Sequence, residues 1–297
     1  MENNAYTYVS YGLGIRSELC LPELPIESKS PDVEIKRERP NVPVQSSEME
    51  NECFWANDNE VYRFYKNVGS FLIRHGREIL IKSVPGVDER ILRGFLLGNI
   101  FGFLLHQRGM LVLHGSAIAM DEKAIVFLGP SGSGKSTAAA SLTSRGCSLV
   151  ADDLVAINSN GDVPLVYPAF PQLKLCQDAA NSLGHDPKSL LYISPIDKSK
   201  RAIRITSGFS ADPLPLGQIY LLEYGNSIKK VKLNQKEAMI ELVRNSKAIE
   251  LLNVGANLIP HFSQCSKVAK IIPVCQLARP SNLDSLSDFA MFVENDI

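Results

Sequence analysis

The sequence predicts a mixed α/β fold, with a β-rich amino-terminal unit over residues 1–86 and an α/β domain with a mixed sheet over residues 87–297. Two patterns predict this division. Short apolar runs of strand length, broken by proline- and acid-rich stretches, fill the first part. The second part alternates apolar strand-like runs with helical segments, as α/β folds do.

The amino-terminal unit is expected to consist of strands and turns. Strands are predicted at 33–39 and 60–67, and as an apolar pair at 71–73 and 79–81. The pair is the clearest signal, because the RHGRE between its members contains Gly76, which supplies the positive φ of a tight turn. The stretches 22–32 and 40–52 are rich in proline and acid and cannot continue a ladder, so we expect loops there.

A helix over 88–107 opens the second part. Asp88 and Glu89 suit a helix amino terminus, where carboxylates are stabilised. Apolar residues then recur near one face at helical spacing, namely Leu92, Phe95, Leu96 and Phe103. The apolar run 94–105 is about a dozen residues, shorter than the roughly 20 that a bilayer requires. We therefore expect a core helix and no membrane partner.

The central elements come next along the chain. Apolar runs at 110–120 and 122–129 fit two buried strands, and an alanine-rich helix at 135–144 ends before Gly146. The run 148–158 predicts another buried strand. Further strands are predicted at 201–205, 216–224, 229–233 and 272–278, and helices at 235–245, 256–270 and 283–293.

Composition narrows the class of protein. The formal net charge of −1 lacks the basic excess of a dedicated nucleic-acid binder, so neither DNA nor RNA is an expected partner. The six cysteines are scattered, with no Cys-x-x-Cys pair and no histidine cluster at zinc-ligand spacing, which predicts free thiols. Because the amino terminus lacks the basic start and apolar stretch of a secretory signal, we expect a cytoplasmic protein.

The segment GPSGSGKST at 129–137 matches G-x-x-x-x-G-K-[ST] in full, after an apolar strand and before a helix. Such a P-loop turns backbone N–H groups towards phosphate oxygens at a helix amino terminus, so we expect ATP to bind there. The predicted nucleotide-binding residues are Gly129, Ser131, Gly132, Ser133, Gly134, Lys135, Ser136 and Thr137. Lys135 is expected to reach the outer phosphates and Ser136 to coordinate Mg²⁺. ATPases, GTPases, kinases and nucleotide sensors all use this loop, so the reaction stays open.

Asp152 and Asp153 end the apolar run 148–151, which we expect to place them at a strand terminus beside the P-loop. One carboxylate can hold Mg²⁺, and a second allows a proton to be accepted from an attacking hydroxyl. A solvated turn with a single metal-linked aspartate is the alternative. His114, at the end of an apolar run, is either a hydrogen-bonded structural histidine or a neighbour of this pair.

Together, LHGSAIAM, GPSGSGKS and RGCSLVADDLV resemble the catalytic core of the HPr kinase/phosphorylase family, over residues 114–155. The resemblance implies the P-loop core shared by HPr kinases and phosphoenolpyruvate carboxykinases, and phosphoryl transfer from ATP to a serine hydroxyl. It implies Asp152 as the base, Asp153 with Ser136 at the metal, and His114 and Lys135 as further catalytic residues.

The family's second signature, an Arg-Gly-x-Gly-Ile stretch, is not found after Val155. The layout of the chain, including YGLGIRSELCLPELP, is instead similar to kinases that phosphorylate lasso-peptide precursors. That similarity implies a small ribosomally made peptide as substrate, modified at its carboxy-terminal serine. Two alternatives stay open: an HPr(Ser) kinase/phosphorylase, and a non-catalytic ATP-gated regulatory module.

Basic residues gather around residue 200. Arg201 and Arg204 are candidate substrate-binding residues, because a guanidinium pairs in bidentate fashion with phosphate or carboxylate. A solvated basic face is the competing interpretation. The sequence is compatible with a homo-oligomer.

Overall fold

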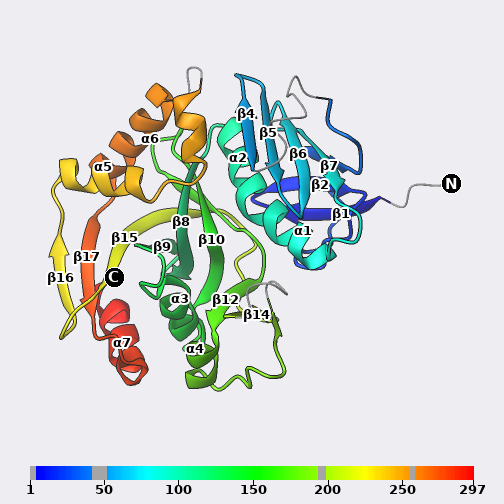
Figure 1. Cartoon of the computed structure of the whole chain (residues 1–297). Helices are drawn as coiled ribbons and strands as arrows, with labels where there is room; N and C mark the ends of the chain where they lie inside the picture. The colour runs from blue at the N-terminus through cyan, green and yellow to red at the C-terminus, as the bar shows by residue number, and fades with distance from the viewer. Residues whose placement is uncertain (1–4, 42–51, 193–198, 255–257) are drawn as a thin grey trace. The chain divides into compact units, whose positions relative to one another are not determined.

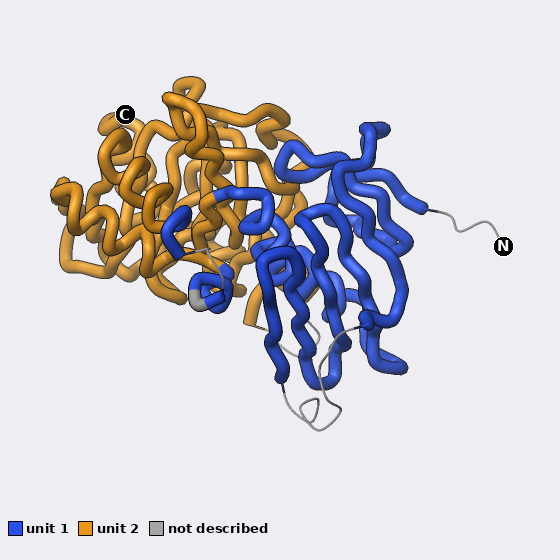
Figure 2. The backbone as a smooth tube through the Cα atoms, turned by 90° about the horizontal axis from the view of Figure 1, so that it is seen from above, with its two compact units in different colours: residues 1–110, 248–261 blue, residues 111–247, 262–297 orange. Residues whose placement is uncertain are grey.

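The computed structural model describes residues 5–41, 52–192, 199–254 and 258–297. The chain forms two compact units (Figure 2), one of Met1–Met110 with Ala248–His261 and the other of Leu111–Lys247 with Phe262–Ile297. These units divide after Met110, whereas the sequence pattern changes near residue 86. Most of the loop expected at 40–52 and the first two residues of the helix expected at 256–270 lie outside the described residues.

Unit 1 contains one seven-stranded sheet, in the order β1-β2-β3-β7-β6-β5-β4 (Figure 1). Its strands are β1 (Tyr6–Ser10), β2 (Leu13–Ser17), β3 (Val33–Lys36), β4 (Cys53–Ala56), β5 (Glu60–Tyr65), β6 (Gly69–Arg74) and β7 (Glu78–Ser83). β3 pairs in parallel with β2 and β7, and the other pairs are antiparallel. The predicted hairpin is confirmed as β6 and β7, with Gly76 at a φ of 61° in its turn.

A helical segment at 89–107 confirms the helix predicted over 88–107, but it packs against the sheet of unit 1 and not in the second domain where the sequence placed it. It consists of α1 (Glu89–Phe95), a π-helical turn (Leu96–Ile100) and α2 (Phe101–Gln107). The Asp88 side chain caps α1 by accepting a hydrogen bond from the backbone N of Arg90 at 2.8 Å. Aromatic contacts join the helices to the strands, because Phe95 lies 4.4 Å from Tyr65 by ring centroids.

Unit 2 is built on a mixed seven-stranded sheet, in the order β11-β10-β8-β9-β15-β17-β16 (Figure 1). Its strands are β8 (Leu111–Met120), β9 (Lys123–Leu128), β10 (Ser148–Asn158), β11 (Leu165–Tyr167), β15 (Leu214–Tyr224), β16 (Lys229–Lys232) and β17 (Val274–Arg279). β9, β15 and β17 run parallel, so their carboxyl ends meet at one edge. β11 pairs with both β10 and β15, which closes five strands into a ring.

Helix α3 (Lys135–Thr143) follows β9 after a glycine-rich loop and packs on this sheet. Ala138, Ala139 and Leu142 are buried against apolar residues of β8, β9 and β12. A second, three-stranded antiparallel sheet consists of β12 (Gln172–Cys176), β14 (Lys200–Arg204) and β13 (Leu191–Tyr192). β11, β12 and β13 were not among the predicted strands.

Of the remaining helices, α5, α6 and α7 match the predicted positions to within a few residues. α5 covers Gln235–Arg244 and α7 covers Leu286–Asp296, whereas α6 (Leu258–Ile271) begins in unit 1 and continues in unit 2. The short helix α4 (Gln177–Ser182) was not predicted. A 3-10 turn, Ile249–Asn253, lies in unit 1, and another, Leu283–Ser285, precedes α7. Among the described helices, none has the length and apolar character needed to cross a bilayer.

The expected place of the two aspartates at a strand terminus is wrong. Asp152 and Asp153 do not end a strand but lie in the middle of β10, where β10 keeps its antiparallel pairing to β8 from Ser148 to Ile157. The strand can continue through these two carboxylates because each accepts hydrogen bonds from donors in the same unit.

Candidate functional site

The loop at 129–134 leads from the end of β9 to the first turn of α3. Gly129, Gly132 and Gly134 have φ values of 139°, 84° and 87°, in the left-handed region that favours glycine. Gly134 is the N-cap residue of α3, with no side chain to occupy the helix amino terminus. The free backbone N–H groups of that first turn and the helix dipole make this end of α3 suited to an anion.

Lys135, the first residue of α3, is 7% exposed. Its ammonium donates to the carbonyl oxygens of Gly129 at 2.8 Å and Pro130 at 2.9 Å. Burial lowers the pKa of Lys135 to about 8, the neighbouring Lys200 adds to this effect, and the two aspartates of β10 oppose it. A buried ammonium therefore lies beside the loop, close to the helix amino terminus.

Asp152 is 4% exposed and accepts three hydrogen bonds. Its Oδ1 accepts from Ser116 Oγ at 2.6 Å and from Ser136 Oγ at 2.8 Å. Its Oδ2 accepts from the backbone N of Lys174 at 2.8 Å. Burial raises the pKa of Asp152, although these three donors act in the opposite direction.

Asp153 is more accessible, with 24% of its side chain exposed. Its Oδ2 accepts from Lys174 Nζ at 2.8 Å, and its Oδ1 lies 3.3 Å from His114 Nδ1. Burial acts to raise the pKa of Asp153, but Lys174 and His114 outweigh it and hold the pKa well below its usual value. Asp153 is thus kept ionised.

The backbone of Asp153 has a φ of 74°. Neighbouring residues of a regular strand point to opposite faces, yet the side chains of Asp152 and Asp153 reach the same cavity. The left-handed conformation breaks the alternation of faces, and Asp tolerates it better than most residues. Backbone strain of this kind is found at functional sites more often than elsewhere.

These groups surround a cavity of about 360 Å³. Of the residues predicted from the sequence, the cavity is lined by His114, Ser131, Gly132, Gly134, Lys135, Ser136, Thr137, Asp152 and Asp153. Gly129 and Ser133 belong to the same loop but do not line it. The Ser133 hydroxyl is buried and has no hydrogen-bond partner among the described residues.

Arg201 and Arg204, the predicted substrate residues, are not brought into this cavity. Arg201 is 4% exposed, donates from Nε to the carbonyl of Pro187 at 2.9 Å, and lies over the Tyr192 ring at 3.7 Å. Arg204 is exposed at the end of β14. The basic residue of this strand that does line the cavity is Lys200.

Several lining residues were not predicted from the sequence, among them Lys174, Tyr224 and Arg279. A signal existed for Lys174, because Leu173 and Leu175 flank it with the alternation of a strand. Tyr224 and Arg279 are the last residues of the parallel strands β15 and β17, at the edge where α/β proteins bind ligands. Lys200 belongs to the basic group around residue 200 that the sequence offers for phosphate or carboxylate binding.

The hydroxyl of Ser136 and the carboxylate of Asp152, which meet in the first cavity, are suitable ligands for a magnesium ion. Ser136 was expected to share the metal with Asp153, but its hydroxyl bonds to Asp152. No cluster of three His, Cys, Asp or Glu side chains able to hold a metal is found in the described part of the chain. Mg²⁺ fits such a sparse set, because it keeps several waters and takes one or two protein ligands together with phosphate oxygens.

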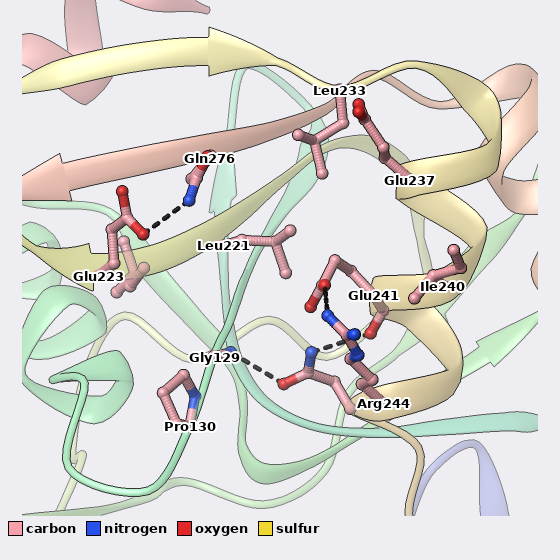
Figure 3. Close-up of a pocket in the computed structure, with 12 residues that line it drawn as sticks. Gly129, Pro130, Leu221, Glu223, Leu233, Glu237, Ile240, Glu241, Arg244 and Gln276 are labelled. Atoms are coloured by element: carbon pink, nitrogen blue, oxygen red, sulfur yellow. Dashed lines mark hydrogen bonds and ion pairs between the residues drawn. The ribbon is translucent and has the colours of Figure 1, made fainter.

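A second cavity, of about 450 Å³, lies at the other end of the loop (Figure 3). Gly129 and Pro130 contribute to it, together with α5 and side chains of β15 and β17. Glu223 accepts a hydrogen bond from Gln276 at 2.6 Å across the wall of this cavity. Asn245, just after α5, accepts from the backbone N of Gly129 at 3.0 Å and so ties that helix to the loop.

Comparison with solved structures gives a distant likeness. No family model and no curated protein matches the sequence. Among solved structures, the chain is similar to the HPr(Ser) kinase/phosphatase from Coxiella burnetii, with 12% identity and a TM-score of 0.33. The match covers 62% of this chain and 95% of that one.

Proposed function

We propose that unit 2 is an ATP- and Mg²⁺-dependent phosphotransferase that phosphorylates a serine hydroxyl. One observation carries the proposal: a buried lysine, a helix amino terminus and two carboxylates of opposite pKa tendency meet in one cavity. The lysine and the helix suit a polyphosphate, and the carboxylates suit a metal and a proton. A protein that only senses a nucleotide needs no second carboxylate there.

The two aspartates have different roles in this proposal. Asp152 is buried and already accepts three hydrogen bonds, one of them from Ser136, so it orients Ser136 and the metal. Asp153 is accessible and ionised, so it accepts the proton of the substrate serine. This reverses the division that the sequence motif suggested, because the hydrogen bond of Ser136 goes to the first aspartate.

The transfer balances with these groups. The serine oxygen forms a bond to the γ-phosphorus of ATP, the bond from that phosphorus to the β–γ bridging oxygen breaks, and ADP leaves. The serine proton passes to Asp153, which His114 orients from 3.3 Å. Lys135 stabilises the phosphate oxygens. Mg²⁺, held by Ser136 and Asp152, would neutralise phosphate charge.

The test compares two variants. Asp153→Asn should abolish phosphate transfer while ATP affinity in the presence of Mg²⁺ stays within a few-fold of the wild type. Asp152→Asn should lower both transfer and the Mg²⁺-dependent part of ATP affinity. Transfer is followed by mass spectrometry and affinity by calorimetry. Asp162→Asn, at an exposed position outside the cavity, is the matched control.

Two outcomes contradict the proposal. Wild-type transfer by Asp153→Asn removes this residue from the role of base. ATP binding by the wild type without transfer to any peptide supports the regulatory module instead.

For the substrate, we propose a small ribosomally made peptide whose carboxy-terminal serine is modified, as the sequence similarity to lasso-peptide precursor kinases implies. A synthetic precursor ending in serine should gain about 80 Da per phosphate, whereas the same peptide ending in alanine should gain nothing. HPr is the second substrate to assay, because an HPr kinase/phosphorylase is the competing function. Phosphorylation of HPr and not of the precursor would decide for that function.

A further inference from the structure

Arg279, the last residue of β17, is a charged side chain in a buried position, which is unusual for an arginine. It is 1% exposed and is one of the largest fully buried side chains of the chain. Its Nη1 donates to the carbonyl of Pro280 at 3.0 Å, but its Nε has no hydrogen-bond partner among the described residues. A buried polar group without a partner is costly, and a buried cation more so.

The guanidinium lies directly on the glycine-rich loop. A Cβ built on Gly134 would come within 2.2 Å of Arg279 Nη2, so the absence of a side chain at residue 134 makes room for the arginine. Tyr224 pairs with Arg279 across β15 and β17 and donates from its hydroxyl to the carbonyl of Gly132 at 2.9 Å. The two residues thus hold the loop from the carboxyl ends of adjacent parallel strands.

In the part of the chain that the structure describes, aromatic rings, rather than carboxylates, lie next to the guanidinium of Arg279. The guanidinium carbon lies 5.2 Å from the ring centre of Tyr224 and 5.7 Å from that of Phe289. No ion pair of Arg279 with a carboxylate is found in the described residues. Burial lowers the pKa of Arg279, while Tyr224 acts against this. The amino terminus of α3, at Gly134, adds a partial positive charge of the same sign.

We propose that Arg279, positioned by Tyr224, is an anion clamp that binds the phosphates of the ligand held by the loop. Arg279 lines the same cavity as Lys135, and its guanidinium is already stripped of water, so a polyphosphate gains a charge-assisted hydrogen bond without further desolvation of the protein. The clamp rests on the proposed function, because it acts on the same nucleotide.

Two measurements separate a clamp from a structural arginine. A structural role predicts that Arg279→Met destabilises the ligand-free protein. A clamp predicts the reverse, because removing a buried cation without a counter-charge relieves its desolvation, and the midpoint of thermal unfolding stays equal or rises. The same variant should bind inorganic pyrophosphate and ADP roughly 10- to 100-fold more weakly.

The experiment uses the full chain and calorimetric titration with pyrophosphate, which contains no base or ribose. Arg279→Lys keeps the charge and should recover part of the affinity. Arg145→Met is the matched control, because this arginine forms an exposed pair with Glu294 at 2.7 Å outside the cavity. Its pyrophosphate affinity should equal that of the wild type.

The results also distinguish the clamp from the proposed function. If the wild type binds pyrophosphate and Arg279→Met binds it equally well, the clamp is refuted while the phosphotransferase stands. If Arg279→Met loses both affinity and thermal stability, Arg279 is structural and the clamp is again refuted. If the wild type binds neither pyrophosphate nor ATP, both proposals fall.

Discussion

Gly132 and Gly134 show how much a single methyl group matters in the loop. Both have left-handed φ values, 84° and 87°, so alanine at either position has the same backbone strain. Their surroundings differ. A Cβ at Gly132 meets no atom within 4 Å, whereas a Cβ at Gly134 collides with Arg279.

This difference defines a matched pair of variants. Gly132→Ala and Gly134→Ala should each lower the free energy of unfolding by about 1–2 kcal/mol through backbone strain. Gly134→Ala should in addition displace the guanidinium and weaken pyrophosphate binding roughly tenfold more than Gly132→Ala does. Chemical denaturation and calorimetry measure the two effects. Equal affinities of the two variants would mean that the position of Arg279 is unimportant for binding.

For single residues, the sequence predicted which side chains form the site better than it predicted the side chains they contact. Lys135, Ser136, Asp152, Asp153 and His114 were all expected in one site, and the structure brings them into one cavity. The partners were not predictable, because Lys174 and Arg279 reach the cavity from strands distant in sequence. The motif also could not reveal that Ser136 bonds to Asp152, since that bond depends on how α3 packs against β10.

Helix α5 lines the second cavity and contacts the loop through its carboxyl end. At its amino terminus Asn234 and Glu237 form a capping box, with both bonds at 3.0 Å. At its carboxyl end Asn245 donates from Nδ2 to the carbonyl of Glu241 at 2.8 Å and accepts from the backbone N of Gly129. Only the second asparagine touches the loop.

Variants of the two asparagines can therefore separate the effect of a less stable α5 from the effect of losing its contact with the loop. Asn234→Ala and Asn245→Ala should each lower stability by about 1 kcal/mol. Asn245→Ala should also weaken ATP binding several-fold, because the start of the loop loses its anchor, whereas Asn245→Asp keeps the acceptor and should bind ATP better than the alanine variant. Loss of affinity in Asn234→Ala as well would show that general destabilisation is the cause.

Elements with strong periodicity were predictable, and short ones were not. The helix at 89–107, the hairpin of β6 and β7, and α3 appear close to their predicted ranges. Strands β11 to β13 have two to five residues, and β13 is exposed, so they lack a long apolar pattern. Pairing with β14 and β15 stabilises them, and such pairing is not a property of a local segment.

Over the whole molecule, the reactivity of the cysteines can report where the nucleotide binds. None of the six forms a disulfide, which confirms the expected free thiols. Cys20 and Cys176 are exposed, whereas Cys265 and Cys275 are buried, and burial raises the pKa of Cys265 to about 12. Cys176 lines the candidate cavity and Cys20 does not.

A thiol reagent should therefore modify Cys20 and Cys176 first. ATP with Mg²⁺ should protect Cys176 and leave the modification rate of Cys20 unchanged, as measured by peptide mass spectrometry. Equal protection at both positions would indicate a general change in the protein, and no protection at Cys176 would place the nucleotide elsewhere.

The stability of unit 1 should depend on pH through two histidines. Burial and the nearby His261 lower the pKa of His106 to about 4, and burial lowers that of His261; their rings lie 6.1 Å apart. Because the folded pKa lies below the unfolded value of 6.5, the unfolded chain binds more protons, and this contribution is present above pH 6.5 and lost as the pH falls towards 4.

For His106 the loss should be on the order of 2–3 kcal/mol. His106→Gln should flatten the decline of the unfolding free energy between pH 6.5 and 4, as followed by chemical denaturation. An unchanged slope would mean that His106 is not the group responsible.

Strand β16 forms the outer edge of the sheet in unit 2, pairing among the described strands with β17 alone. All four of its residues are exposed, and three of them are lysines, Lys229, Lys230 and Lys232. The backbone groups at the open edge of such a strand can pair with another chain and extend the sheet, which is a common start of aggregation. Lys230 is paired with Asp296 at 2.6 Å, but two copies that met through this edge would bring the ammonium groups of Lys229 and Lys232 together. These two lysines therefore oppose self-association by strand addition and leave any dimer to form through a different surface.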